Sequence, residues 1–264
     1  MLLIIEALLL ILAALGQDHR AAAVKEQIFS LDMALNSVDD QYKGCREKMA
    51  EKVKTVFLNK EINNSPGFKN AWKKGADFVK TQNDKLTKNH SIAIYVYSEC
   101  NIYTLFNNDT RSGKKQYKHK TYKWYSLYFL LTEAIQILKK TQNKCYSTFR
   151  GTKAEFDKHV LNKEVRFGQF ASSSLVHKKA QRFGNVSCFE IYTCEGADVS
   201  EYSKLPHEEE VLIPPYETFK VTAVRTRREE KNLWCDTVYE LNSTGTRSDL
   251  NCALFKKPTK TIMK

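Results

Sequence analysis

Several residue patterns that mark common enzyme classes are missing from this sequence of 264 residues. Only six histidines occur, and none has the spacing of a metal site. The cysteines include no Cys-x-x-Cys pair, and there is no glycine-rich loop of the phosphate-binding type. His207 lies beside an acidic run without an evident serine partner. The sequence therefore predicts neither a metal site nor a Ser-His-Asp mechanism.

Long apolar runs are also missing after the first sixteen residues. Met1–Gly16 is almost wholly apolar, is short for a membrane span, and ends in an Ala-x-Gly pattern typical of a cleavage site. Glu6 interrupts the run and no Lys or Arg precedes it, but we interpret residues 1–16 as a signal peptide. Asn251–Lys264 has no hydrophobic tail for a lipid anchor or a membrane span. We therefore expect a secreted protein, in the extracellular space or the lumen of granules or the ER.

Cysteines and glycosylation motifs agree with secretion. The chain has seven cysteines, which in this pattern suit disulfides better than a metal site. Asn-x-Ser/Thr acceptor sequences for N-glycosylation occur at Asn63, Asn89, Asn108, Asn185 and Asn242. Both features predict an oxidising compartment.

The formal net charge is +12, which predicts attraction to acidic surfaces such as glycans, phospholipid head groups or acidic proteins. The densest basic cluster, Arg225–Arg228, is followed at once by Glu229 and Glu230. This mixture of signs is typical of a solvated face, so no specific nucleic-acid partner is expected.

The first half of the chain has helical periodicity. Residues 21–60 suit helices, with Leu31 and Val38 in an apolar stripe, and Phe68–Val79 suits a short helix. Tyr122–Lys140 is the clearest helix, because large apolar residues recur three or four positions apart. Ser91–Tyr97 has strand-like residues but also suits a buried helix, and both readings stay open.

After Cys145 short β-branched and aromatic segments alternate with turns. The expected strands are Ser147–Arg150, Glu164–Ala171, Cys188–Thr193, Glu209–Ile213, Thr218–Val224 and Trp234–Leu241. No internal repeat or long low-complexity linker is present. Helices followed by strands predict an α+β fold. We divide the chain into a signal peptide at 1–16, a mainly helical region at 17–143, a β-rich core at 144–255 and a basic tail at 256–264.

The most unusual stretch is His207–Glu217, where three carboxylates run directly into branched apolar residues. In an extended backbone Glu208 and Glu210 would project from one face, about 7 Å apart, with Glu209 on the other face. Two such carboxylates can divide two tasks, one stabilising a cation and one handling a nucleophile. The alternative is a solvated acidic turn before a buried strand.

Three other segments carry residues suited to a ligand site. Phe149–Thr152 places an arginine before a glycine, which can present a guanidinium and backbone N–H groups to a phosphate. Arg166–Leu175 contains three serines, which suit either a polar turn or a ligand contact. Ala180–Gly184 has an aromatic residue beside a glycine, which suits stacking on a flat ring.

Together these segments resemble the vertebrate arginine-specific mono-ADP-ribosyltransferases, ecto-enzymes related to bacterial toxins with an Arg-Ser-Glu-x-Glu pattern. The likeness covers nearly the whole chain after residue 16 and is closest to secreted or avian-type members. The matching motifs are Asp39–Cys45, Leu130–Ala134, Arg150-Gly151, Val165–Leu175, Ile191–Cys194, Glu208–Pro215 with Glu217, and Asn251-Cys252. The resemblance implies helices packed on a mixed β-sandwich core.

The resemblance also implies which residues bind NAD (or NADP) as the co-substrate. Arg150 matches the arginine that holds the phosphates, and Gly151 lets the backbone approach the ligand. Ser172 matches the active-site serine. Phe183 matches the aromatic residue that stacks near nicotinamide, although a small length difference in this loop weakens the match.

The two carboxylates receive separate roles from the resemblance. Glu210 matches the catalytic glutamate, which stabilises positive charge on the ribose as the bond to nicotinamide breaks. Glu208 matches the glutamate that holds and activates the acceptor guanidinium. The implied reaction is mono-ADP-ribosylation of arginine side chains, without a metal. Its alternative is NAD hydrolysis at the same site.

Finally, the resemblance pairs Cys45 with Cys252 and Cys145 with Cys194. Cys100, Cys188 and Cys235 remain, and at least one of them is expected to be free or intermolecular. The implied partners are arginine-containing proteins, extracellular or on cell surfaces, and the protein is expected to be a monomer.

Overall fold

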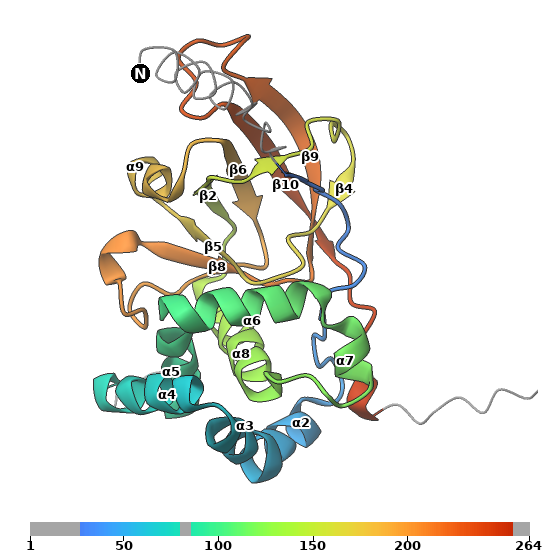
Figure 1. Ribbon diagram of the computed structural model, residues 1–264, viewed down its shortest axis with the longest axis vertical. Coiled ribbons are helices and arrows are strands. Elements are labelled where there is room, and N and C mark those ends of the chain that lie inside the picture. The colour runs from blue at the N-terminus through green and yellow to red at the C-terminus, as the bar shows by residue number, and fades with distance from the viewer. Residues whose placement is uncertain (1–26, 80–85, 256–264) are drawn as a thin grey trace, which may run out of the picture.

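The computed structural model describes residues 27–79 and 86–255. The signal peptide at 1–16 and the basic tail at 256–264, both expected from the sequence, lie outside the described residues. Figure 1 shows a helical layer on one side of the molecule and a twisted sheet on the other. The α+β class expected from the sequence is confirmed, with helices preceding the main sheet in the chain.

Helices dominate the chain between residues 46 and 142. They are α2 (Arg46–Lys52), a π-helical turn (Val53–Phe57), α3 (Leu58–Asn64), α4 (Pro66–Phe78), α5 (Lys88–Tyr97), α6 (Cys100–Ser112), α7 (Lys114–Lys118) and α8 (Tyr125–Gln142). The later helical segments are short: α9 (His177–Ala180) and 3₁₀ turns at Gln181–Phe183, Pro206–Glu208 and Ala253–Phe255. Within the described ranges, no helix is long and apolar enough to cross a membrane.

The strands in the described part of the chain form two sheets. A small parallel pair joins β1 (Ile28–Phe29) to β3 (Glu155–Phe156). The main sheet has the order β4-β9-β10-β6-β2-β5-β8-β7. Its strands are β4 (Glu164–Val165), β9 (Glu217–Thr226), β10 (Thr237–Thr246), β6 (Ser187–Thr193), β2 (Tyr146–Thr152), β5 (Ala171–Ser174), β8 (Glu210–Ile213) and β7 (Ala197–Asp198). Only the β10–β6 pair in this sheet is parallel.

The sheet divides where β2 meets β5, because a single residue pair, Phe149 with Ser174, joins the two strands. The β5-β8-β7 portion lies nearest the helices in Figure 1, whereas β9 and β10 extend away from them. The helical layer has its own core, centred on α8, whose residues are buried almost without interruption from Tyr125 to Ile135. A second apolar core, which includes Phe189 and Phe219, lies on the β9-β10-β6 portion.

The open question about Ser91–Tyr97 is answered by α5. All seven of these residues are buried in the helix, which packs against α4 and α8. A helix buried on every side has no polar face, so its apolar run carries no helical period. Thr87 caps it by accepting a hydrogen bond from the backbone N–H of His90.

The expectation of helices throughout 21–60 is wrong for residues 27–45, while 21–26 lie outside the described residues. Apart from β1, residues 27–45 are irregular and the first helix begins at Arg46. Asp32 accepts a hydrogen bond from the backbone N–H of Ala34, which has the left-handed φ of 46°. This local turn competes with a helix. Leu31 and Val38 are buried in different cores, so their spacing does not mark one helix face.

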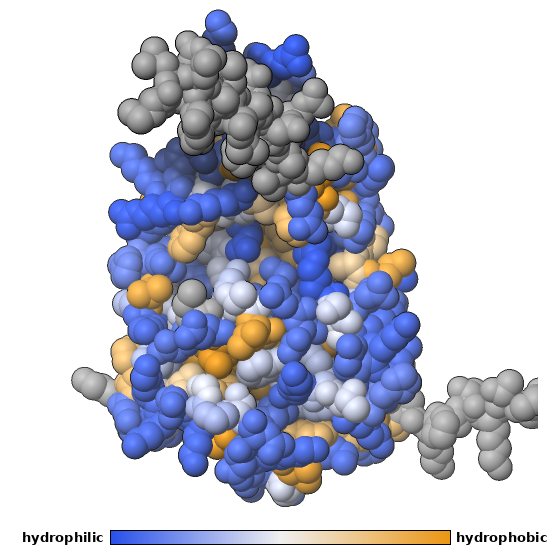
Figure 2. Space-filling view, in the orientation of Figure 1, coloured by the Kyte–Doolittle hydropathy of each residue, from blue (hydrophilic) through white to orange (hydrophobic). Residues whose placement is uncertain are grey.

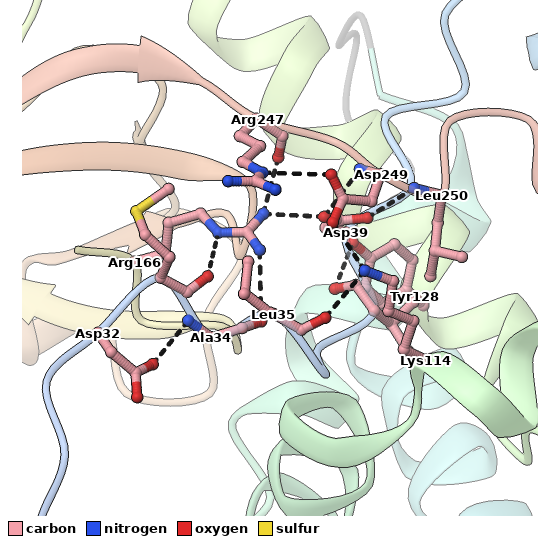
Figure 3. A network of polar contacts seen from close by, with 12 residues as sticks. Asp32, Ala34, Leu35, Asp39, Lys114, Tyr128, Arg166, Arg247, Asp249 and Leu250 are labelled. Carbon is pink, nitrogen blue, oxygen red and sulfur yellow. Dashed lines mark hydrogen bonds and ion pairs between the residues drawn. The ribbon is translucent and has the colours of Figure 1, made fainter. Parts of the chain in front are cut away.

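The expected single strand at Glu164–Ala171 is also wrong. It is two strands, β4 and β5, separated by Arg166–Phe170. Arg166 is fully buried, and its Nη1 lies 2.8 Å from Oδ2 of Asp39 (Figure 3). The same guanidinium donates to the backbone oxygens of Met33 and Arg247, each at 2.8 Å. This network fastens the irregular segment 30–40 and the end of β10 to the sheet. Arg166, at its centre, lies in the segment that separates β4 from β5.

The described residues contain three disulfides. Cys45–Cys252 joins the start of the helical layer to the end of the described chain, and Cys145–Cys194 joins β2 to the end of β6. These are the pairs implied by the family resemblance. Cys188–Cys235 is the third bond and ties β6 to the segment before β10. That segment begins the expected strand Trp234–Leu241, which in the structure starts at Thr237.

Candidate active site

A cleft of about 480 Å³ opens between the helical layer and the β2-β5-β8 portion of the sheet. Figure 2 shows this face hollowed between its upper and lower halves. All six residues selected from the sequence line the cleft: Arg150, Gly151, Ser172, Phe183, Glu208 and Glu210. They come from four separate segments, so the fold has assembled them. A cleft of this volume suits a small-molecule ligand.

Arg150 lies on β2 with its guanidinium held by two contacts. Nη1 donates to the backbone oxygen of Ser172 at 2.5 Å, and Nη2 donates to the hydroxyl of Tyr103 at 3.3 Å. Tyr103 comes from α6 in the helical layer. A guanidinium fixed in this way keeps its remaining N–H groups in a defined direction, which suits a phosphate with several acceptor oxygens.

The three serines of β5 have different neighbours. Ser173 donates to the backbone oxygen of Val211 at 2.9 Å, and Ser174 donates to that of Glu208 at 2.7 Å. The hydroxyl of Ser172 instead faces two acceptors, the hydroxyl of Tyr97 at 3.4 Å and the carboxylate of Glu210. The second and third serines therefore hold the carboxylate segment in register with β5. The first remains half-buried at the cleft.

Tyr97, at the end of α5, joins this site to the helical layer. Its hydroxyl donates to the backbone oxygen of Phe170 at 2.9 Å and accepts from Nδ2 of Asn107 at 3.2 Å. Burial raises the pKa of Tyr97 well above 10, so the phenol keeps its proton. Neither Tyr97 nor Tyr103 carries a local sequence signal for this role, because each is indistinguishable from an ordinary aromatic core residue.

Glu210 begins β8 opposite Ser174 and is only 6% exposed. Its pKa is raised to about 7, mainly because burial penalises the carboxylate. The nearby negative charge of Glu208 raises it further, whereas a hydrogen bond from Ser172 and the positive charge of Arg150 act in the opposite direction. Glu210 therefore changes charge in the physiological pH range.

The backbone around Glu208 differs from the extended strand that was expected. It ends the 3₁₀ turn Pro206–Glu208, and Glu209 has the left-handed φ of 48°, so the extended strand with alternating faces is wrong for this pair. The turn still leaves Glu208 and Glu210 in the same cleft, and Glu209 pairs with Lys179 at 2.7 Å. Burial raises the pKa of Glu208, and the charges of His207, Arg182 and Lys179 oppose this shift.

Phe183 lies on the rim of the cleft with 53% of its surface exposed. It ends the 3₁₀ turn that follows α9, and this turn packs closely on β2. A Cβ atom at Gly151 would collide with the backbone oxygens of Ala180 and Gly184. The glycine in the Arg-Gly motif is therefore required by the turn that carries Phe183, a reason that the sequence did not reveal.

Within residues 27–79 and 86–255, no group of three or more His, Cys, Asp or Glu side chains has an arrangement that could hold a metal ion. The polar groups that line the cleft instead include a guanidinium, an ammonium group, several hydroxyls, two phenols and two carboxylates. Such a set can bind a phosphate-containing ligand and stabilise a cation beside it.

This fold is shared with a solved mono-ADP-ribosyltransferase. The crystal structure of the eukaryotic enzyme ART2.2 matches with a TM-score of 0.73 and 32% identity, covering 86% of this chain and 100% of that one. A mutant of ART2.2 solved in complex with NADH matches with a TM-score of 0.72, 32% identity and the same coverage. The molecule therefore has the fold of the mono-ADP-ribosyltransferases.

Sequence comparison identifies the family. Residues 31–244 match the family model described as NAD:arginine ADP-ribosyltransferase. A chicken protein, NAD(P)(+)--arginine ADP-ribosyltransferase 2, is 36% identical over 235 residues, which cover 86% of this chain and 73% of the relative. Human ecto-ADP-ribosyltransferase 4 is 32% identical over 265 residues, which cover 96% and 81%. The chain belongs to the NAD:arginine ADP-ribosyltransferase family.

Proposed function

We propose that this protein transfers a single ADP-ribose from NAD to arginine side chains of proteins and releases nicotinamide. The observation that supports this most directly is the convergence of Arg150, Ser172, Glu208 and Glu210 in one cleft of a chain that belongs to the arginine-specific family. NAD is the co-substrate, as the names of the relatives state for those proteins.

The negative charges of NAD are bound by a cation in the cleft. The guanidinium of Arg150 binds the pyrophosphate, and its contacts with Ser172 and Tyr103 fix its direction before the ligand arrives. Gly151 brings the backbone of β2 close to the ligand. Phe183, on the rim, stacks near the nicotinamide ring.

Chemistry follows from the two carboxylates. The bond between the ribose anomeric carbon and the nicotinamide nitrogen breaks first, and nicotinamide leaves with the bonding electron pair. The ionised carboxylate of Glu210, aided by Ser172, stabilises the positive charge that develops on the ribose. A guanidinium nitrogen of the acceptor then attacks the opposite face of that carbon and inverts its configuration.

Glu208 acts on the acceptor. A guanidinium holds its proton throughout the physiological pH range because of its high pKa, and it is a poor nucleophile until a base accepts that proton. Glu208 is only partly buried at the cleft and is placed to hold the guanidinium and take that proton. Without a bound acceptor, water attacks the same carbon, so slow NAD hydrolysis accompanies transfer.

We further propose that the protein acts as a secreted monomer on extracellular or cell-surface proteins. Three disulfides and five exposed glycosylation acceptors suit an oxidising compartment. The acceptors are Asn63, Asn89, Asn108, Asn185 and Asn242. The division into a helical region at 17–143 and a catalytic core at 144–255 is part of the same proposal, although α5 and α6 also supply cleft residues.

The test is incubation of the purified protein with NAD labelled in its ADP-ribose part and a small guanidino acceptor such as agmatine. The expected result is labelled acceptor and free nicotinamide, with both lost in Glu210→Gln, which keeps the shape of the side chain and removes its charge. Nicotinamide release without labelled acceptor would instead identify an NAD glycohydrolase. If the parental protein forms neither labelled acceptor nor free nicotinamide, both activities are refuted.

A further inference from the structure

A second groove lies beside the active-site cleft, on the other side of the turn that carries Phe183. Its walls include Lys178, Arg182, Asn185, Arg227 and Trp234, and we call these residues the basic groove. One wall is α9 with its following turn, and the other is the segment between β9 and β10. Figure 2 shows hydrophilic side chains over the α9 region of this face.

The basic groove carries positive charge that the protein does not neutralise. Neither Lys178 nor Arg182 forms an ion pair within the described parts of the chain, and both are exposed. Two nearby carboxylates have other partners: Glu209 pairs with Lys179 at 2.7 Å, and Asp236 pairs with Arg227 at 2.9 Å. Glu208 interacts with Arg182 only through its charge. An anionic partner would therefore meet two available cations.

A disulfide and a ring contact hold one side of the basic groove in place. The disulfide Cys188–Cys235 holds the segment between β9 and β10 against β6. Next to it, the ring of Trp234 packs against that of His177, with centroids 4.4 Å apart. A surface that is fixed before binding loses little entropy when a partner docks.

The basic groove adjoins the cleft across the turn Gln181–Phe183. Arg182 directly precedes Phe183, which lines the cleft with Glu208. The positive charge of Arg182 opposes the rise in the pKa of Glu208 caused by burial, so the two groups lie within electrostatic range. A protein segment that presents an arginine to Glu208 would extend its neighbouring residues toward Arg182 and Lys178.

We propose that the basic groove selects protein acceptors in which acidic residues flank the modified arginine. The aspartate or glutamate side chains of the target pair with Lys178 and Arg182 while its arginine lies at Glu208. This inference rests on the proposed transferase function, and it names the class of protein substrate. It also explains how a strongly basic enzyme attracts an arginine-bearing target that it would otherwise repel.

The test compares three peptides that differ only around one arginine, which is flanked by aspartate and glutamate, by asparagine and glutamine, or by lysine. Every protein is assayed both with native Asn185 and as Asn185→Gln, which separates any effect of a glycan at the groove wall from the effect of the two cations. The measured quantity is kcat/KM for each peptide and for agmatine. Two exposed ion pairs predict a preference of about 3- to 20-fold for the acidic peptide over the neutral one. The preference should fade at high salt.

A double charge reversal, Lys178→Glu with Arg182→Glu, should invert the order so that the lysine-flanked peptide reacts fastest. The matched control is Lys69→Glu with Lys73→Glu on α4, which reverses two exposed lysines in the helical layer and should leave the preference unchanged. If the reversed protein melts early, Lys178→Gln with Arg182→Gln provides the second test, and it should abolish the preference. Any effect that the loss of Arg182 has through the pKa of Glu208 should change agmatine and the three peptides alike, because agmatine lacks flanking residues. The preference is therefore taken as kcat/KM for each peptide divided by that for agmatine.

Equal kcat/KM values for the three peptides, with agmatine still modified, would refute acidic docking and leave the transferase function intact. An unchanged preference in both groove variants would equally refute the role of these two residues. Failure of the parental protein to modify agmatine would instead refute the transferase function, and the docking proposal with it.

Discussion

Titration of Glu210 should control the activity of this enzyme in the physiological pH range. The carboxylate has to be ionised to stabilise a positively charged ribose, yet its pKa is raised from 4.5 to about 7. At pH 6 only about one molecule in ten of the free enzyme carries the active charge, and at pH 8 about nine in ten do. We therefore expect kcat/KM for NAD to rise about tenfold between these two values.

Two substitutions should move this midpoint in opposite directions. Ser172→Ala removes a hydrogen bond that lowers the pKa of Glu210, so the midpoint should rise. Glu208→Gln removes a nearby negative charge that raises it, so the midpoint should fall. The assay is initial nicotinamide release at low NAD concentration from pH 5 to 9, because kcat/KM reports the pKa values of the free enzyme.

The same pKa predicts the pH dependence of stability. The folded state holds the proton of Glu210 more tightly than the unfolded state does, so its contribution is fully present below about pH 4.5 and is lost as the pH rises through 7. The loss is on the order of 3 kcal/mol. Relative to the parental protein, Glu210→Gln should become more stable as the pH rises. A pH-independent kcat/KM down to pH 5, or shifts of the same sign in the two variants, would refute this account of Glu210.

Two further predictions concern stability and the shape of the cleft. Arg166→Met leaves the buried carboxylate of Asp39 without its counter-ion and should lower the free energy of unfolding by about 3–5 kcal/mol, measured by chemical denaturation. The control is Lys204→Met, which breaks an exposed ion pair with the partly exposed carboxylate of Glu99 and should lower the free energy of unfolding by at most about 1 kcal/mol. Equal losses of stability in the two variants would contradict the role given to burial. Gly151→Ala pushes the turn that carries Phe183 away from β2, so it should cost about 1–3 kcal/mol and raise KM for NAD. Gly67→Ala on α4, where nothing would touch the new methyl group, is its control, and an unchanged KM in Gly151→Ala would show that this turn does not shape the NAD site.

Elements with an unbroken hydrophobic period could be predicted from the sequence. The helix α8 was expected because its large residues repeat at helical spacing, and β2 and β6 because β-branched and aromatic residues cluster between turns. The irregular segment before Arg46 could not be predicted, since Asp32 and Asp39 hold it with side-chain hydrogen bonds and a buried ion pair. Distant partners of this kind leave no local pattern.

The order and spacing of several motifs identify the residues of the candidate site, whereas each segment alone does not. Glu208 was expected in an extended strand, but it ends a 3₁₀ turn and the next residue has a left-handed backbone. Local sequence does not predict this conformation. Tyr97 and Tyr103 were missed because hydrogen bonds to Ser172 and Arg150 exist only after α5 and α6 have packed on the sheet. Side chains that position a site from another layer are visible only in the folded molecule.

The division of labour between the two carboxylates is the central claim of this mechanism, and measuring both products of Glu208→Gln tests it most directly. The purified variant is incubated with labelled NAD and agmatine, and labelled agmatine and total nicotinamide are counted from the same reaction. Loss of labelled agmatine with continued nicotinamide release is the predicted result, since Glu210 still stabilises the ribose cation while no base activates the acceptor. Transfer to agmatine at the parental rate would contradict the role of Glu208.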